Sequence, residues 1–205
     1  MSRIFPLLLP GLLLLSASAL AQGIRFEPHD ATAPEATVAG SIRGAEGNLE
    51  VTVLAPPRLA ATAMDAPVLY WHASGPISDP VELVLVEEGG VDPLVELRVE
   101  TPLERGIHRF VLPPDTRLKP GTFYQWSVSV IPDPDARSND VFSSALLQRV
   151  PSTGAPSSGA QAARELAGAG LWYDTLMALR QAKDDPETAR LWRELMEQAG
   201  LQAVL

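Results

Sequence analysis

Side chains with oxygen ligands gather in one short stretch of the chain, from residue 133 to residue 140. Carboxylate and amide oxygens are the ligands that calcium prefers, so this stretch is a candidate calcium loop. Proline and arginine interrupt the ligand spacing, and the alternative is a polar turn in which the arginine pairs with neighbouring acids. We expect the polar turn and assign no metal ligand. The candidate residues of this loop are Asp133, Asp135, Arg137, Ser138, Asn139 and Asp140.

Residue patterns for other common chemistries do not occur in the sequence. There is no cysteine, which excludes disulfides, thiolate metal sites and a cysteine nucleophile. The three histidines, His29, His72 and His108, do not fall at metal-binding spacings. A Gly-x-Ser-x-Gly nucleophile turn and a phosphate-binding glycine loop are both missing. We therefore assign no catalytic residue and expect no cofactor, with calcium the one possibility that the acidic stretch leaves open.

The charge of the chain argues against nucleic acid as a partner. Acidic residues outnumber basic ones by 25 to 16, and the formal net charge is −9. Nucleic-acid binding needs a concentrated cationic surface, and the sequence contains no basic cluster.

The first 21 residues have the pattern of an export signal. Arg3 gives a positive start, an apolar run extends over residues 4–15, and Ala19-Leu20-Ala21 is a small-x-small cleavage pattern. The rival interpretation is an uncleaved anchor, but a spanning helix needs roughly 20 apolar residues. We expect a mature chain that begins at Gln22, without stable membrane insertion, in the periplasm or outside the cell.

Short segments of alternating apolar and polar residues predict a mainly β domain over residues 48–150. Turn residues separate them, and the gaps are too short for crossover helices. We therefore predict an antiparallel β-sandwich of about seven strands, of the immunoglobulin or fibronectin type III kind. The predicted strands lie at residues 49–53, 67–72, 81–87, 94–99, 107–112, 123–131 and 141–150.

A turn before the sixth predicted strand supports this architecture. Residues 118–126 read Leu-Lys-Pro-Gly-Thr-Phe-Tyr-Gln-Trp. In a tyrosine corner the tyrosine hydroxyl bonds back to the backbone of the preceding loop, and Tyr124 is placed to do so.

After the sandwich the hydrophobic period changes from 2 to about 3.6, which predicts helices. We expect a flexible linker over residues 151–159 and a two-helix hairpin over 160–205, whose first helix covers 161–182. Asp185-Pro186 predicts the start of the second helix, and Gly200 predicts its end. Residues 22–47 show no sustained period, and we expect a mobile N-terminal segment there.

Aromatic side chains offer two further candidate sites. Trp172, Tyr173 and Trp192 either pack the hairpin against itself or the sandwich, which we expect, or dock a partner protein. Tyrosines and tryptophans on a sandwich can also bind sugars, although core packing competes for residues inside strands. The candidates for sugar binding are Tyr70, Trp71, Phe123, Tyr124 and Trp126.

The order of several motifs resembles an exported bacterial family catalogued as a domain of unknown function, number 928. The matching segments extend over roughly residues 49–201, and cysteine and glycine residues frequent in the family near Arg137 are missing here. The resemblance implies an exported sandwich with a helical tail and assigns no activity. Its motifs are residues 53–56, Tyr70-Trp71, the corner at 118–126, residues 137–140, Gly170-Leu171-Trp172-Tyr173-Asp174 and Trp192.

Two classes of function remain open. The first is a non-enzymatic exported binding or scaffolding module of the cell envelope, with another envelope protein as partner. The second is a hydrolase that acts on an envelope polymer through a carboxylate pair whose spacing the sequence does not reveal. The sequence leaves the oligomeric state undetermined.

Overall fold

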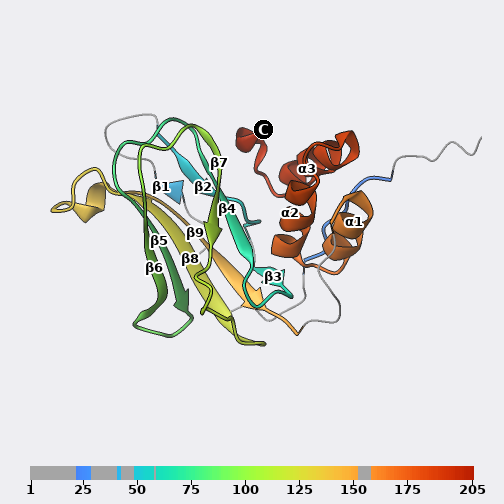
Figure 1. The fold of residues 1–205 in the computed structure, drawn as a ribbon, viewed down its shortest axis with the longest axis horizontal. Helices are drawn as coiled ribbons and strands as arrows, with labels where there is room; N and C mark the ends of the chain where they lie inside the picture. The colour runs from blue at the N-terminus through green and yellow to red at the C-terminus, as the bar shows by residue number, and fades with distance from the viewer. Residues whose placement is uncertain (1–21, 29–40, 43–48, 58, 152–157) are drawn as a thin grey trace, which may run out of the picture.

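The computed structural model describes residues 22–28, 41–42, 49–57, 59–151 and 158–205. Two β-sheets lie beside a group of three C-terminal helices (Figure 1). The expected signal at 1–21 and most of the expected linker lie outside the described residues.

The larger sheet has its strands in the order β1-β9-β8-β5-β6, and β3 also pairs with β9. All its pairings are antiparallel except the one between β3 and β9, which is parallel. The smaller sheet has the order β2-β4-β7. The larger sheet contains β1 (Ser41–Ile42), β3 (Ala60–Thr62), β5 (Val81–Glu87), β6 (Pro93–Val99), β8 (Phe123–Val130) and β9 (Val141–Arg149), and the smaller contains β2 (Val51–Val53), β4 (Val68–Ala73) and β7 (Gly106–Val111).

The alternation that predicted the strands also builds the core. In β5 the buried positions Val81, Leu83 and Leu85 alternate with half-buried ones, as expected when one face of a sheet is covered. All seven predicted strands are present, and their ends differ from the prediction by at most two residues. The sequence analysis missed β1 and β3, which have two and three residues, too few to show a period.

The turn before β8 has the predicted hydrogen bond. Lys119 donates its backbone N–H to the hydroxyl oxygen of the buried Tyr124, at 2.9 Å. Gly121 has φ of +79°, a conformation that glycine adopts readily, which brings the loop back over the tyrosine.

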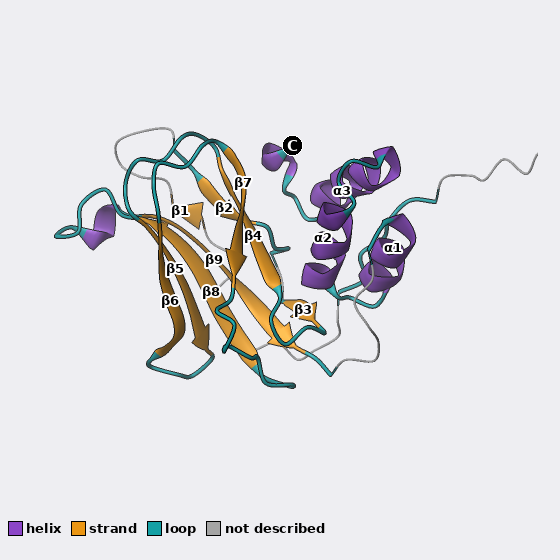
Figure 2. Cartoon of the chain, in the orientation of Figure 1, coloured by secondary structure: helices purple, strands orange, loops and turns teal. Residues whose placement is uncertain are grey.

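The helical region differs from the predicted hairpin, because it contains three α-helices (Figure 2). These are α1 (Ala160–Gly168), α2 (Trp172–Gln181) and α3 (Pro186–Gln198). The single helix predicted over 161–182 is wrong, since the chain turns at Gly170, whose φ is +74°. Leu171 N–H then bonds the carbonyl of Leu166, which closes a Schellman motif and ends α1.

Both ends predicted for the last helix are confirmed. The Asp185 side chain accepts a hydrogen bond from Glu187 N–H, and Pro186 occupies the first helical position. At the other end Gly200 has φ of +73°, and Leu201 N–H bonds the Met196 carbonyl.

The N-terminal segment that the sequence analysis expected to be mobile is docked over residues 22–28. Glu194 accepts a hydrogen bond from Ile24 N–H at 3.0 Å, and Gln198 accepts one from Phe26 N–H at 3.0 Å. Glu27 N–H bonds the Ala167 carbonyl of α1. The prediction was wrong here because the partners of this segment are side chains and carbonyls about 140–174 residues away, which local periodicity does not report.

Replacing Tyr124 with phenylalanine should destabilise the protein by about 1 kcal/mol, because the hydrogen bond from the part-buried Lys119 N–H is lost. Denaturant unfolding measures this change. The matched control is Tyr70→Phe, since no described residue bonds the Tyr70 hydroxyl. A loss in Tyr124→Phe no larger than in the control would contradict the stabilising role of the corner.

Candidate functional site

Three consecutive residues at the start of α2 attach the helices to the sheets. We call Trp172, Tyr173 and Asp174 the α2 anchor. All three are buried, and each bonds a different part of the β region. Gly170 and Leu171 position them, because the turn that ends α1 sets the direction in which α2 begins.

Trp172 joins the helices to the loop after β2. Its indole N–H donates to the Leu54 carbonyl at 2.7 Å. The ring of Phe26 packs against Trp172 edge to face, with 5.0 Å between the ring centroids. One buried tryptophan therefore contacts the β region and the N-terminal segment together.

Tyr173 reaches between the sheets. Its hydroxyl oxygen accepts a hydrogen bond from the indole N–H of Trp126 at 2.9 Å, and it donates to the Leu146 carbonyl at 3.3 Å. Trp126 lies on the buried face of β8 and is fully buried, as is Tyr173. Burial raises the pKa of Tyr173 well above its ordinary value, so the hydroxyl stays protonated and acts as a hydrogen-bond donor.

Asp174 places a carboxyl group in the interior, where only 6% of the residue is exposed. Both carboxylate oxygens lie 3.2 Å from the backbone N–H of Ala63, and the Thr62 side chain forms another hydrogen bond. Burial raises the Asp174 pKa, while these hydrogen bonds and the charge of Arg149 act in the opposite direction. The carboxyl group thus holds the edge strand β3 against α2.

Arg149 at the end of β9 completes this buried polar cluster. It lies opposite Thr62 in the β3–β9 pairing and is itself buried. Its Nε and Nη1 atoms have no hydrogen-bond partner in the described part of the chain. The sequence analysis missed Thr62, Arg149 and Asp174 as a group, because their proximity depends on the parallel pairing of β3, which has no sequence signal.

Two of the three aromatic residues proposed for partner docking are buried. Trp172 and Tyr173 have no exposed surface and bond to the β region. Trp192 is half-buried, and the guanidinium group of Arg180 lies over its ring at 5.3 Å. Trp172 and Tyr173 therefore belong to a hydrophobic core shared with the sheets, against which Trp192 packs.

A similar result holds for the aromatics proposed as a sugar platform. Tyr70, Trp71, Tyr124 and Trp126 are all buried, and Phe123 is half-buried. A platform for sugar rings needs exposed aromatic faces, and these four side chains present none.

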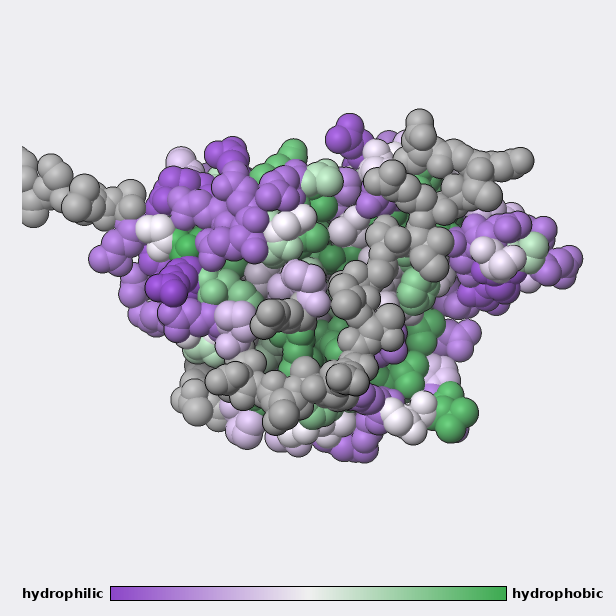
Figure 3. All heavy atoms as spheres, turned by 180° about the vertical axis from the view of Figure 1, so that it is seen from behind, coloured by the Kyte–Doolittle hydropathy of each residue, from purple (hydrophilic) through white to green (hydrophobic). Residues whose placement is uncertain are grey.

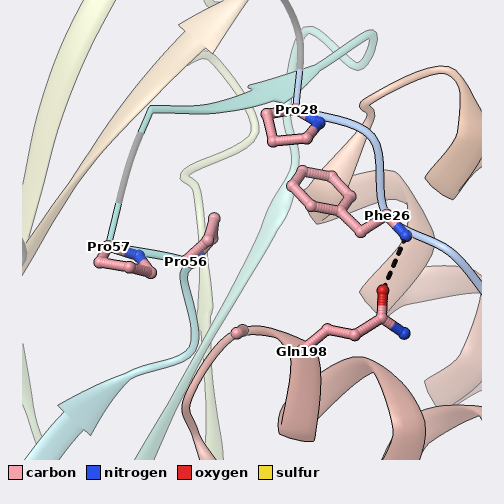
Figure 4. A pocket seen from close by; sticks show the side chains of 6 residues that line it. Phe26, Pro28, Pro56, Pro57 and Gln198 are labelled. Carbon is pink, nitrogen blue, oxygen red and sulfur yellow. Dashed lines mark hydrogen bonds between the residues drawn. The ribbon is translucent and has the colours of Figure 1, made fainter.

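A pocket of about 350 Å³ opens where three distant segments meet. Figure 4 shows Phe26 and Pro28 of the N-terminal segment on one side, and Pro56 and Pro57 of the loop after β2 on the other. Gln198 of α3 closes it and bonds Phe26 N–H. None of its lining side chains among the described residues, which also include Ala199, is ionisable. The described lining offers apolar contact and one amide group.

The outer face of the larger sheet carries apolar, polar and charged side chains. Half-buried Val84 and Val86 of β5 lie in register with Ser127 and Gln125 of β8. The charged Glu82, Glu96 and Arg98 lie on the same face. Seen from behind, apolar residues gather in the middle of the molecule between hydrophilic surfaces at either side (Figure 3).

The acidic loop at 133–140 forms the polar turn that the sequence analysis expected. Arg137 pairs with Asp140 at 2.7 Å and with Glu82 of β5 at 3.0 Å, and Asp133 accepts a hydrogen bond from Asp135 N–H. Ser138 and Asn139 are exposed within the short 3-10 helix Arg137–Asn139. Within the described ranges, no three acidic or histidine side chains lie close enough to hold a metal ion.

The model of the family described as Domain of Unknown Function (DUF928) matches residues 38–205. The chain belongs to the DUF928 family. A search of the curated proteins finds no match. Two of the motifs through which the sequence resembles DUF928 contain Trp126 and the α2 anchor, which bond to each other in the core.

No helix in the described part of the chain is long and apolar enough to cross a membrane.

The raised pKa of Asp174 predicts a pH-dependent stability difference between the wild type and Asp174→Asn. The folded state holds this proton more tightly than the unfolded state, so the contribution of Asp174 to stability is largest at low pH and falls as pH rises through the folded pKa. The free energy of unfolding of the wild type minus that of the variant should decrease as the pH rises above about 4, the ordinary pKa of an unfolded aspartate. Denaturant unfolding at several pH values measures it. A difference that stays constant or grows with pH would refute the assignment.

Proposed function

We propose that this DUF928 protein is an exported, non-enzymatic binding or scaffolding module of the bacterial cell envelope. Its β region is a sandwich of the immunoglobulin or fibronectin type III kind, and the partner is another envelope protein. The signal-like residues 1–21 and the bond from Lys119 to Tyr124 support these two parts of the proposal.

The observation that carries the proposed binding role is the neutral pocket of Phe26, Pro28, Pro56, Pro57, Gln198 and Ala199. Ligand sites are concave and mostly apolar, with a few polar groups that orient the ligand. This pocket has that composition, and its amide side chain is held by the N-terminal segment.

The α2 anchor supports a scaffolding role. Because Trp172, Tyr173 and Asp174 bond to the β region, the helices and the sheets form a single body. A partner that contacts the pocket would touch the N-terminal segment, the β2–β3 loop and α3 with little reorganisation, which lowers the entropy cost of binding.

A hydrolase is less well supported. Hydrolysis of a glycosidic bond needs two carboxyl groups on either side of the scissile bond, about 5 to 10 Å apart. Among the described residues, the lining of the pocket at the junction includes no carboxyl group. Two acids in or beside the polar loop, Asp140 and Glu82, already form ion pairs with Arg137.

Export predicts that the mature protein begins at Gln22. Two arginines, Arg164 and Arg190, donate hydrogen bonds to the Gln22 carbonyl, and these contacts would hold the new N-terminus on the helices after cleavage. Mass spectrometry of the protein from the producing cells should show loss of residues 1–21. Ala21→Asp should block processing, because the peptidase requires a small residue there. An intact Met1 in the wild type would contradict export by this signal.

Partner contact at the pocket predicts position-dependent crosslinking. A photo-crosslinking amino acid at the exposed position 57 should capture a partner in intact cells. The same amino acid at Lys183, which is exposed and does not line the pocket, is the matched control. Equal capture at both positions, or capture at 183 alone, would refute the pocket as the contact site.

A further inference from the structure

Strand β6 ends the larger sheet on the side away from the helices (Figure 2). In the described part of the chain it pairs on one side only, with β5. The other side of an end strand presents unpaired N–H and C=O groups that can pair with a further strand. This edge is therefore a potential interface, and its side chains determine which strand it fits.

The sequence of β6 is complementary to itself. Residues 95–99 read Val-Glu-Leu-Arg-Val, with apolar residues at both ends and in the middle and opposite charges between them. If two such strands run antiparallel with Leu97 facing Leu97, then Glu96 of each lies opposite Arg98 of the other, and Val95 opposite Val99. Within residues 95–99 every pair in this register is favourable, because Glu96 faces Arg98 and apolar residues face apolar residues.

The two charged side chains are available for such pairing. Glu96 and Arg98 are exposed, and neither forms an ion pair with another described residue. Arg98 lies opposite Glu82 in the β5–β6 pairing, but Glu82 is engaged with Arg137 at 3.0 Å. Charged residues normally protect an edge strand from pairing, whereas here a second copy would neutralise both charges.

The apolar residues of β6 would also gain from a second copy. Leu97 and Val99 are only half-buried, although they point to the same face as the buried Val95. An added strand would cover them and join the cores of two sandwiches. Pro93 and Pro102 lie on either side of this segment and lack an N–H, which confines the pairing to a short length.

We propose that two copies of this chain pair through β6, antiparallel, with the two-fold axis at Leu97. The interface is isologous, so it closes on a dimer and leaves no free β6 edge for further growth. It involves no residue of the junction pocket, and it holds whether or not the protein is an exported binding module. In a dimer, two copies of the pocket would belong to one particle, which would allow bivalent binding.

Charge reversal tests the register. Sedimentation velocity on residues 22–205 should find a dimer that weakens at high salt. Glu96→Arg and Arg98→Glu should each weaken association by at least about tenfold, because like charges then face each other. The double variant E96R/R98E restores opposite charges and should dimerise as the wild type does. The control Glu197→Arg changes an exposed residue of α3 and should leave the dimer intact.

Mixing the two single variants gives the decisive result. In Glu96→Arg each chain has arginine at both positions 96 and 98, and in Arg98→Glu each chain has glutamate at both. Each variant alone should therefore be monomeric, whereas the mixture should form a heterodimer in which arginines face glutamates. Recovery in the mixture also shows that both variants are folded. A wild type that is monomeric at every concentration, single variants that stay dimeric, or a mixture that stays monomeric would overturn the proposal.

Discussion

The hydrogen bond between Trp126 and Tyr173 is the interaction on which the rest of the structure depends. It joins the middle of a central strand to the first turn of a helix, at 2.9 Å and without contact to solvent. The Trp126 indole N–H and the Tyr173 hydroxyl are both buried and bond to each other. Removing either group would leave the other without this partner, which would destabilise the fold. Because α2 also packs against β3 of one sheet and β4 of the other, its position relative to both sheets is fixed. Consequently the helices share one hydrophobic core with the sheets.

The N-terminal segment adds a second constraint of a different kind. Glu194 and Gln198 bind its backbone groups at alternate residues, much as a neighbouring strand would. Arg164 and Arg190 hold its first carbonyl, and Phe26 packs on Trp172. This extended segment therefore connects α1 and α3, and it also forms one wall of the pocket. The same contacts that stabilise the helices thus shape the surface for which we propose a binding role.

Local sequence patterns predicted the features that depend on neighbouring residues. The alternation in β5, the corner at Tyr124 and the cap at Asp185 all involve residues within a few positions, and all are present. The sequence analysis failed where long-range contacts decide the outcome. Ala60-Ala61-Thr62 has no strand pattern and forms β3 because β9 and Asp174 hold it. The pocket could not be predicted for the same reason, since its walls come from opposite ends of the chain.

The position of the N-terminal segment has a consequence for the order of folding. Its residues leave the ribosome early, soon after residues 1–21, yet Glu194 and Gln198, which bind Ile24 and Phe26, are 170 and 172 residues further along the chain. The segment must therefore wait until nearly all of the protein has been made. Trp126 likewise has no partner until α2 emerges. During synthesis the β region therefore lacks the helices that cover its interior. The last contacts of folding are made by the last helix rather than by the sheets.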